Sequence, residues 1–213
     1  MMDAIADIRK DYKLKSFAEA DAADSPFDQF TQWWNEAIAS NIDEVNAMTL
    51  ATASPEGYPT ARIVLLKGFN EKGFEFYTNY ESNKGKSIAA NNKVALVFFW
   101  KELERQIRVE GIAEQLPEAT SDAYFMSRPA TSRIGAWSSP QSSVIPSRNI
   151  IDENVKAITQ QFEGKEITRP PFWGGYIVKP VVIEFWQGRS SRLHDRIEYR
   201  LHNGQWLKQR LAP

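Results

Sequence analysis

Three short stretches of the chain join basic side chains to hydroxyl groups: Arg62 and Lys67 around the run IVLL, Lys84 and Lys86 after Thr78 and Ser82, and Arg128, Ser132 and Arg133 after Tyr124. Cations beside hydroxyl groups bind phosphate through charge-assisted hydrogen bonds. A solvated protein surface also contains such short groupings, so phosphate binding and an ordinary surface both stay open for each stretch taken alone.

The spacing of Arg62 and Lys67 carries more information. Residues five apart in one extended strand point to opposite faces, unless a bulge or the end of the strand re-aims one of them. The two cations are therefore expected to serve two different anions.

A second candidate site is the stretch QGRSSRLHDR at 187–196, where arginines and a histidine flank a leucine at the end of an apolar strand. Loops on a rigid scaffold often carry function, although a solvated turn is the plain alternative. The tryptophans Trp173, Trp186 and Trp206 could stack on a flat ring, but core packing is the favoured interpretation.

Several kinds of chemistry are not supported. The chain has neither G-x-G-x-x-G nor G-x-x-x-x-G-K-[ST], so side chains must hold any phosphate, and it has no nucleophile-elbow pattern. With no cysteine, disulfides, thiolate nucleophiles and iron–sulfur clusters are excluded. His194 and His202 are the two histidines, and no metal site is expected.

The charge balance gives no global field that would attract nucleic acid or an anionic membrane, since 26 basic residues face 27 acidic ones. The N-terminus mixes both charge signs and lacks the apolar stretch of a signal peptide or membrane anchor, which predicts a cytoplasmic protein. The length of 213 residues favours a single domain over residues 25–213, after a mobile segment over residues 1–24.

Apolar residues at three- and four-residue spacing predict a helix over 27–40, and Asp24-Ser25-Pro26 before it supplies an N-cap residue and a first-turn proline. Strands separated by turn signals are expected at 47–54, 60–69, 73–80, 94–100, 105–116, 176–188 and 197–211, the last turning at Asn203-Gly204. The first three strands read as a meander, Gly111 is expected to mark a bulge or a close backbone approach, and further helices are expected at 84–90, 117–126 and 149–162. Because helices do not alternate with strands, the pattern favours a mainly β fold, an antiparallel barrel with added helices.

Nine ordered segments then resemble the pyridoxine/pyridoxamine 5′-phosphate oxidase family: RIVLLK at 62–67, FYTN at 76–79, LERQ at 103–106, SRPATSRIGAW at 127–137, QSS at 141–143, FWGG at 172–175, IEFWQG at 183–188, RLHDR at 192–196 and the terminal RLAP. The resemblance runs from about Ala47 to Pro213. It implies an FMN-binding split antiparallel β-barrel and a homodimer with FMN at the subunit interface. It also implies oxidation of pyridoxine or pyridoxamine 5′-phosphate to pyridoxal 5′-phosphate, with O2 as acceptor, H2O2 as product and ammonia released from the amine.

The resemblance assigns residues to FMN as follows: Arg62, Ile63, Val64, Leu65, Leu66, Lys67, Tyr77, Thr78, Asn83, Lys84, Gln106, Gln141, Ser142, Trp186 and Arg196. It assigns these to the substrate: Lys67, Tyr124, Arg128 and Ser132 at the phosphate, and Arg192, Leu193 and His194 at the pyridine ring. Arg192 and His194 are the expected catalytic residues. The family often has arginine at the position of Asn83, so the FMN phosphate is expected to meet one charge fewer.

Two alternatives remain beside this assignment. One is a flavoprotein of the same fold acting on another ring, such as the phenazine-pathway oxidases, and the other is a non-catalytic carrier of pyridoxal phosphate or flavin. The segments SRPATS and RLHDR favour the vitamin B6 substrate. The run RKDY at 9–12 resembles a family segment that folds over the substrate. A disordered tail is the alternative interpretation of these four polar residues.

Overall fold

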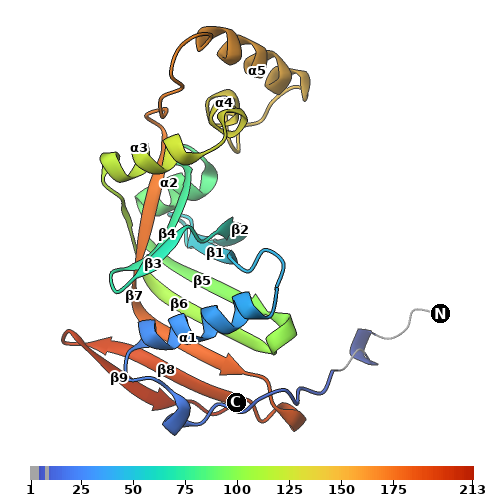
Figure 1. Cartoon of the computed structure of the whole chain (residues 1–213), viewed down its shortest axis with the longest axis vertical. Helices are drawn as coiled ribbons and strands as arrows, with labels where there is room; N and C mark the ends of the chain where they lie inside the picture. Colours follow the sequence, from blue (N-terminus) through green and yellow to red (C-terminus); the bar gives the residue numbers. More distant parts are fainter. Residues whose placement is uncertain (1–4, 8–9) are drawn as a thin grey trace. The chain divides into compact units, whose positions relative to one another are not determined.

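The computed structural model describes residues 5–7 and 10–213 of the chain (Figure 1). Within them, the contacts define two compact units: unit 1 comprises residues up to 49, 95–110 and 180–213, and unit 2 comprises residues 50–94 and 111–179. Four strands contribute residues to both units: β1 (Ala47–Ala53), β5 (Lys93–Trp100), β6 (Arg105–Gln115) and β7 (Trp173–Gln187). The strand order of the sheet is β2 (Pro59–Leu65), β1, β5, β6, β7, β4 (Gly73–Asn79) and β3 (Gly68–Asn70). In addition, β8 (Asp195–His202) pairs with β7 and β9 (Gln205–Arg210). The expected single domain over 25–213 stays a prediction.

Unit 1 contains the predicted first helix, α1 (Pro26–Ala39). The Ser25 hydroxyl accepts a hydrogen bond from the backbone N–H of Phe27, and Pro26 occupies the first turn, as expected. The helix buries aromatic residues against the strands: Phe30 lies 5.3 Å from Phe98 between ring centroids, and Trp33 lies 5.3 Å from Phe185. These rings form the core of unit 1.

The chain ends in the predicted hairpin of β8 (Asp195–His202) and β9 (Gln205–Arg210). Its two-residue turn is Asn203-Gly204, both with positive φ, at 48° and 80°. A type I′ turn needs positive φ at both central residues, which explains the Asn-Gly pair. Strand β8 runs antiparallel to β7, with Trp186 opposite Arg196.

The described part of the N-terminal segment also belongs to unit 1. Phe17 is buried, and the backbone N–H groups of Lys13 and Leu14 donate to Oε2 of Glu104 at 2.9 and 3.1 Å. The carbonyl of Ala23 accepts a hydrogen bond from the Tyr199 hydroxyl. Residues 1–4, 8 and 9 lie outside the described residues, and the predicted mobility of residues 1–24 stays a prediction.

Unit 2 contains β2 (Pro59–Leu65), β3 (Gly68–Asn70) and β4 (Gly73–Asn79). The predicted meander is wrong in one respect: β4 pairs with β3 and with the distant β7, Phe76 lying opposite Tyr176, and β2 pairs with β1. The partner of β4 therefore lies about a hundred residues away in sequence, and local turn signals carry no information about such a pairing.

The helices of unit 2 are α2 (Asn83–Ala90), α3 (Glu118–Ser127), α4 (Ala130–Ser138) and α5 (Asn149–Gln161). Three were predicted, and α4 was not. The predicted close approach at Gly111 is confirmed, because a Cβ there would lie 2.5 Å from the Lys179 carbonyl oxygen. None of the helices in the described part of the chain is long and apolar enough to cross a membrane.

Candidate functional site

A cavity of about 520 Å³ in unit 2 gathers much of the predicted site. Its lining comprises Ile63, Val64, Leu65, Lys67, Tyr77, Thr78, Asn79, Lys84, Tyr124, Arg128, Pro129, Ser132, Gln141 and Trp173. Three of these side chains are cationic, and the lining among the described residues contains no carboxylate. The cavity therefore carries an uncompensated positive charge and suits an anionic ligand.

The end of β2 brings backbone and a lysine to the cavity. The strand ends at Leu65, so Lys67 lies beyond it, and its backbone N–H donates to the Glu75 carbonyl at 2.8 Å. The expectation that Arg62 and Lys67 point to opposite faces applies only within one strand. It therefore does not apply to Lys67, which follows the end of β2. Lys67 lines the cavity and Arg62 does not.

Arg62 is held by neutral oxygens. Its Nη1 donates to the Leu50 carbonyl at 3.0 Å and to the Thr52 hydroxyl at 2.9 Å, and its Nη2 donates to the Thr60 hydroxyl at 2.6 Å. Burial lowers the pKa of Arg62. A guanidinium stays protonated at neutral pH, so Arg62 keeps its charge although three oxygens fix its position.

Lys84 has the same kind of surroundings. Its Nζ lies 3.2 Å from the hydroxyls of Thr78 and Ser82 and 3.2 Å from Oε1 of Gln141. Burial lowers the pKa of Lys84, and the charge of Arg62 lowers it further. Two cations that repel each other, with neutral partners only, are stabilised when an anion binds between or beside them.

Three aromatic rings line the other part of the cavity in a nearly parallel arrangement. Tyr77 and Tyr124 stack at 3.8 Å between centroids, and the ring of Trp173 is tilted by 4° from Tyr124 and by 16° from Tyr77. Burial, with a contribution from the Glu75 charge, raises the pKa of Tyr77 to about 12. The Tyr77 hydroxyl is therefore a hydrogen-bond donor at neutral pH.

Arg128 lies at the end of α3, beside these rings. Its guanidinium carbon is 4.6 Å from the Trp173 ring centroid, and burial lowers its pKa. Its Nη1 is buried without a hydrogen-bond partner among the described residues. A buried donor without a partner is costly, so this atom points to a ligand that accepts its hydrogen bond.

The donor set therefore fits a phosphate-bearing ligand with a flat ring. Lysine and arginine side chains bind phosphate oxygens, hydroxyls and Gln141 supply further hydrogen bonds, and aromatic faces suit a ring. The volume lies within the range of small-molecule sites.

Unit 1 contains a second group of predicted residues on β7 and β8. Glu184 is buried and binds Arg196 through two hydrogen bonds, from Nε to Oε1 and from Nη2 to Oε2, both at 3.0 Å. Arg196 Nη1 donates to the Ala212 carbonyl, and hydrogen bonding to Glu184 raises the pKa of Arg196. Trp186 lies opposite Arg196 on the neighbouring strand, so both side chains share one face of the sheet.

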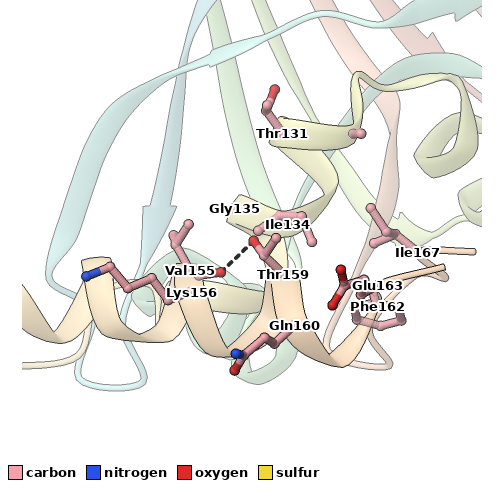
Figure 2. Close-up of a pocket in the computed structure, with 11 residues that line it drawn as sticks. Thr131, Ile134, Gly135, Val155, Lys156, Thr159, Gln160, Phe162, Glu163 and Ile167 are labelled. Carbon is pink, nitrogen blue, oxygen red and sulfur yellow. Dashed lines mark hydrogen bonds between the residues drawn. The ribbon is translucent and has the colours of Figure 1, made fainter. Parts of the chain in front are cut away.

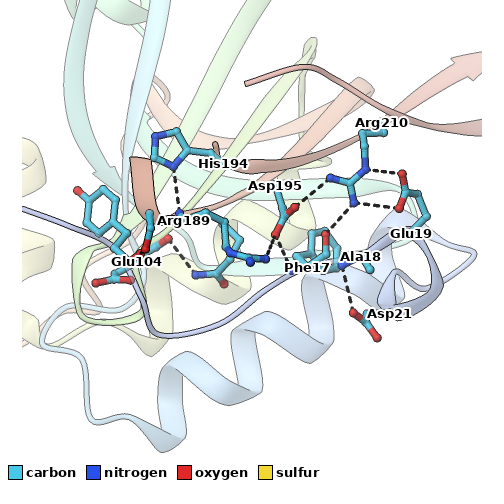
Figure 3. Close-up of polar contacts among 12 residues, drawn as sticks. Phe17, Ala18, Glu19, Asp21, Glu104, Arg189, His194, Asp195 and Arg210 are labelled. Carbon is cyan, nitrogen blue, oxygen red and sulfur yellow. Dashed lines mark hydrogen bonds and ion pairs between the residues drawn. The ribbon is translucent and has the colours of Figure 1, made fainter. Parts of the chain in front are cut away.

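The loop after β7 contains Arg192, Leu193 and His194, and Figure 3 shows His194 beside Arg189. The side chains of Arg192 and Leu193 are exposed, and the backbone of Arg192 has a positive φ of 62°. Nδ1 of His194 accepts a hydrogen bond from the backbone N–H of Arg189 at 3.1 Å. Burial lowers the pKa of His194, and the charge of Arg192 lowers it further. His194 is therefore neutral at neutral pH.

Asp195 connects this loop to the N-terminal segment (Figure 3). Its carboxylate accepts hydrogen bonds from the backbone N–H of Phe17 at 3.0 Å, from Arg189 at 2.8 Å and from Arg210 at 2.9 Å. From the run at 9–12, residue 9 lies outside the described residues. The Tyr12 ring lies 5.8 Å from Trp186 and 6.1 Å from His194.

The predicted residues thus fall into two groups. Four predicted residues of unit 2 lie outside the cavity lining: Arg62, the buried Leu66, Asn83 at the start of α2, and Ser142, which has a φ of 72°. In unit 1 lie Gln106, Trp186, Arg192, Leu193, His194 and Arg196. The predicted site did not include Asn79, Pro129 and Trp173 of the lining, although three of the matched segments, at 76–79, 127–137 and 172–175, contain them.

A larger cavity, of about 1010 Å³, lies between α4 and α5 (Figure 2). Ile134, Val155, Phe162 and Ile167 give it an apolar lining, and Lys156 and Glu163 are its charged residues. It contains none of the predicted site residues. The smaller cavity, which is lined by Lys67, Lys84 and Arg128, contains the cationic groups that can bind a phosphate.

Comparison with known proteins agrees with the family resemblance found in the sequence. Residues 34–162 match the family model described as pyridoxamine 5′-phosphate oxidase, and residues 173–213 match the pyridoxine 5′-phosphate oxidase C-terminal dimerisation region. The chain is 51% identical to the pyridoxine/pyridoxamine 5′-phosphate oxidase of a Cyanothece strain and 54% identical to that of Ralstonia pickettii, each match covering 100% of both chains.

Among solved structures, the chain resembles PhzG from Burkholderia lata, in complex with tetrahydrophenazine-1-carboxylic acid, with a TM-score of 0.87 and 26% identity over 93% of this chain and 98% of that one. It also resembles a pyridoxamine 5′-phosphate oxidase-related, FMN-binding protein from Nostoc punctiforme, with a TM-score of 0.70 and 17% identity over 89% of this chain and 98% of that one. The predicted split-barrel fold is confirmed by these similarities.

Proposed function

This chain belongs to the pyridoxamine 5′-phosphate oxidase family, and from that premise we propose how its own residues carry out the oxidation of pyridoxine and pyridoxamine 5′-phosphates. The observation that carries the proposal is the cavity of unit 2, which combines Lys67, Lys84 and Arg128 with stacked aromatic rings and has no carboxylate among its described lining residues. The substrate and a flavin nucleotide each consist of a flat ring joined to a phosphate. The cavity has the groups that bind both features.

The cofactor is proposed to be FMN, which accepts a hydride from the substrate when it is bound. Lys84 and Arg62 are proposed to neutralise its phosphate, with Thr78 and Gln141 as hydrogen-bond partners. The geometry supports this role, because both cations are held by neutral oxygens that do not compensate their charge. Asn83, where the family often has arginine, adds no charge.

The substrate phosphate is proposed to be bound by Arg128, Lys67, Tyr124 and Ser132. The pyridine ring of the substrate is proposed to be contacted by Arg192 and His194. Because Nδ1 of His194 already accepts a hydrogen bond, the neutral imidazole has its proton on Nε2. In this arrangement His194 offers a donor to the ring. Accepting a proton would require the bond to Arg189 to break.

The electron acceptor is proposed to be O2, with H2O2 as product and ammonia released from the amine. One rival is a phenazine-type oxidase, favoured by the structural similarity to PhzG. The full-length relatives named pyridoxine/pyridoxamine 5′-phosphate oxidase are about twice as similar in sequence, which favours the B6 substrate. The other rival is a carrier without turnover.

Oxygen uptake and peroxide formation on addition of pyridoxamine 5′-phosphate to the FMN-loaded protein test the proposal. The expected result is one peroxide and one pyridoxal 5′-phosphate for each O2 consumed. Binding of pyridoxamine 5′-phosphate without oxygen uptake would identify a carrier, and oxidation of tetrahydrophenazine-1-carboxylic acid in its place would identify the other oxidase.

The match of residues 173–213 to a dimerisation region supports a homodimer. We further propose that FMN binds at the subunit interface and that the protein is cytoplasmic. Sedimentation of the FMN-loaded protein tests the first point, since a monomer that binds FMN and turns over would contradict it.

A further inference from the structure

The side chain of Arg128 is positively charged, half-buried and without a carboxylate partner among the described residues. Its guanidinium faces two aromatic rings: the carbon Cζ is 4.6 Å from the centroid of Trp173 and 5.4 Å from that of Phe125. Its Nη1 has no hydrogen-bond partner among the described residues. The rings are therefore the contacts that fix the position of this cation.

The backbone holds Arg128 at one fixed place. It directly follows α3, its φ and ψ of −76° and 149° are extended, and its N–H donates to the Phe125 carbonyl at 3.2 Å. The following residue is Pro129, and a residue before proline is restricted to extended conformations. What remains adjustable is the direction of the long side chain.

Trp173 is itself held rigidly. It is 7% exposed, it begins β7, and its backbone lies opposite Asn79 of β4. Its ring packs edge-on against Phe125 at 5.2 Å, and its plane lies within 4° of Tyr124. A rigid ring can serve as a platform for a flexible side chain.

The choice of a ring in place of a carboxylate has a chemical consequence. A carboxylate would orient Arg128 by occupying its N–H groups, and it would neutralise the charge that a phosphate needs. The face of a tryptophan attracts a guanidinium through its ring quadrupole and leaves the N–H groups in the guanidinium plane free. The attraction grows as the groups are removed from water, and Trp173 is 7% exposed while Nη1 of Arg128 is buried.

We propose that Trp173 is a positioning residue for Arg128: its ring holds the guanidinium in the cavity with its charge and its N–H groups available to the substrate phosphate. This inference rests on the proposed role of Arg128. Trp173 acts through Arg128, whose guanidinium carbon lies 4.6 Å from the centroid of its ring.

The test is a double-mutant cycle between Trp173→Leu and Arg128→Ala in the FMN-loaded protein, read as KM for pyridoxamine 5′-phosphate. Trp173→Leu is expected to raise this KM about 2- to 30-fold, the range of a cation–π contact, with a smaller effect on kcat. In the Arg128→Ala background the same change is expected to have an effect of less than about twofold. Trp173→Phe, which keeps a ring, is expected to restore most of the loss.

Two measurements separate positioning from a structural role. Unphosphorylated pyridoxamine should lose less than about twofold in kcat/KM, and FMN affinity should not change, whereas general loosening would affect both. Trp137→Leu is the matched control, because Trp137 packs on Phe162 and Phe172 and has no contact with Arg128 among the described interactions. An equal KM increase with and without Arg128 would overturn the proposal.

The outcomes also distinguish this inference from the proposed function. If Arg128→Ala leaves KM for the phosphorylated substrate unchanged, the proposed role of Arg128 fails. If Arg128→Ala raises KM and Trp173→Leu does not, only the positioning role fails. If Trp173→Leu does not fold, Trp173→Phe is measured in the wild-type and Arg128→Ala backgrounds. In the wild-type background a KM increase of about two- to threefold is expected. The same increase in the Arg128→Ala background would contradict the proposal.

Discussion

The backbone N–H of Arg189 donates a hydrogen bond to Nδ1 of His194 at 3.1 Å, five residues further along the same loop. A ring nitrogen that accepts a hydrogen bond carries no proton, so the neutral ring has its proton on Nε2. Protonation of Nδ1 would place two N–H groups against each other. The bond therefore fixes both the direction and the tautomer of the imidazole.

From this relationship we predict that His194 titrates below its ordinary pKa of 6.5, since burial and then the Arg192 charge disfavour the imidazolium. The ring is neutral above that pH and gains a proton only as the pH falls further. NMR titration of the imidazole nitrogens in a His202→Gln variant observes His194 alone, because the chain has two histidines. A pKa at or above 6.5, or a neutral ring protonated on Nδ1, would contradict the prediction.

We predict that Arg192→Ala and His194→Ala keep FMN bound but lower kcat/KM for pyridoxamine 5′-phosphate by about tenfold or more, the effect of losing a hydrogen bond to a charged group. Both residues lie in the loop proposed to contact the substrate ring. Flavin content and steady-state kinetics measure the two effects separately. Arg200→Ala, which removes an exposed arginine of β8, is the matched control. Wild-type kinetics in both loop variants would remove RLHDR from the site.

We predict that Arg128→Ala raises KM for pyridoxamine 5′-phosphate about 10- to 150-fold, because a charge-assisted hydrogen bond contributes about 1.5–3 kcal/mol. The effect appears in kcat as well if the phosphate contact also sets the position of the ring. Pyridoxamine, which has no phosphate, should be affected much less. An equal decrease for both substrates would assign Arg128 to the fold and not to phosphate binding.

We predict that Asp195→Asn destabilises the protein by about 1–3 kcal/mol at pH 7, since its carboxylate accepts hydrogen bonds from Phe17, Arg189 and Arg210. Burial raises the pKa of Asp195, but these hydrogen bonds outweigh it and lower the pKa below 3.8. The stabilisation is therefore complete above the unfolded value of 3.8 and is lost as the pH falls through the folded value.

Denaturant unfolding of wild type and Asp195→Asn from pH 7 to pH 2 measures this difference. The exposed Asp152, 3.9 Å from Arg148, supplies the control Asp152→Asn, for which a change near zero is expected. A difference between wild type and Asp195→Asn that persists undiminished at pH 2 would show that the charge of Asp195 is not its source.

The sequence predicted most strands and helices because their signals are local. The residue type at a single position or pair of positions was enough to predict three features: the N-cap of α1, the Asn203-Gly204 turn and the close backbone approach at Gly111. Helix α4 was missed because it is only nine residues long and contains Gly135, although Ala130, Ile134 and Trp137 have helical spacing. The pairing of β4 with β7 was missed because it joins segments far apart in sequence.

For the site, residue types predicted phosphate binding, and the resemblance supplied the roles. Trp173 shows the limit of this approach, since a tryptophan near a strand was expected in the core. It is buried and also lines the cavity, because its ring packs on Phe125 in a T-shaped arrangement while its face meets Arg128. Only the structure shows which of its surfaces is used.

The absorbance spectrum of the purified protein, before and after anaerobic addition of pyridoxamine 5′-phosphate, tests the central claim most directly. We predict a yellow protein with the two absorption bands of an oxidised flavin, in which the long-wavelength band is lost on addition of substrate while pyridoxal 5′-phosphate forms, and returns when air is admitted. A colourless protein that does not take up added FMN, or a yellow one whose spectrum does not change with substrate, would contradict it.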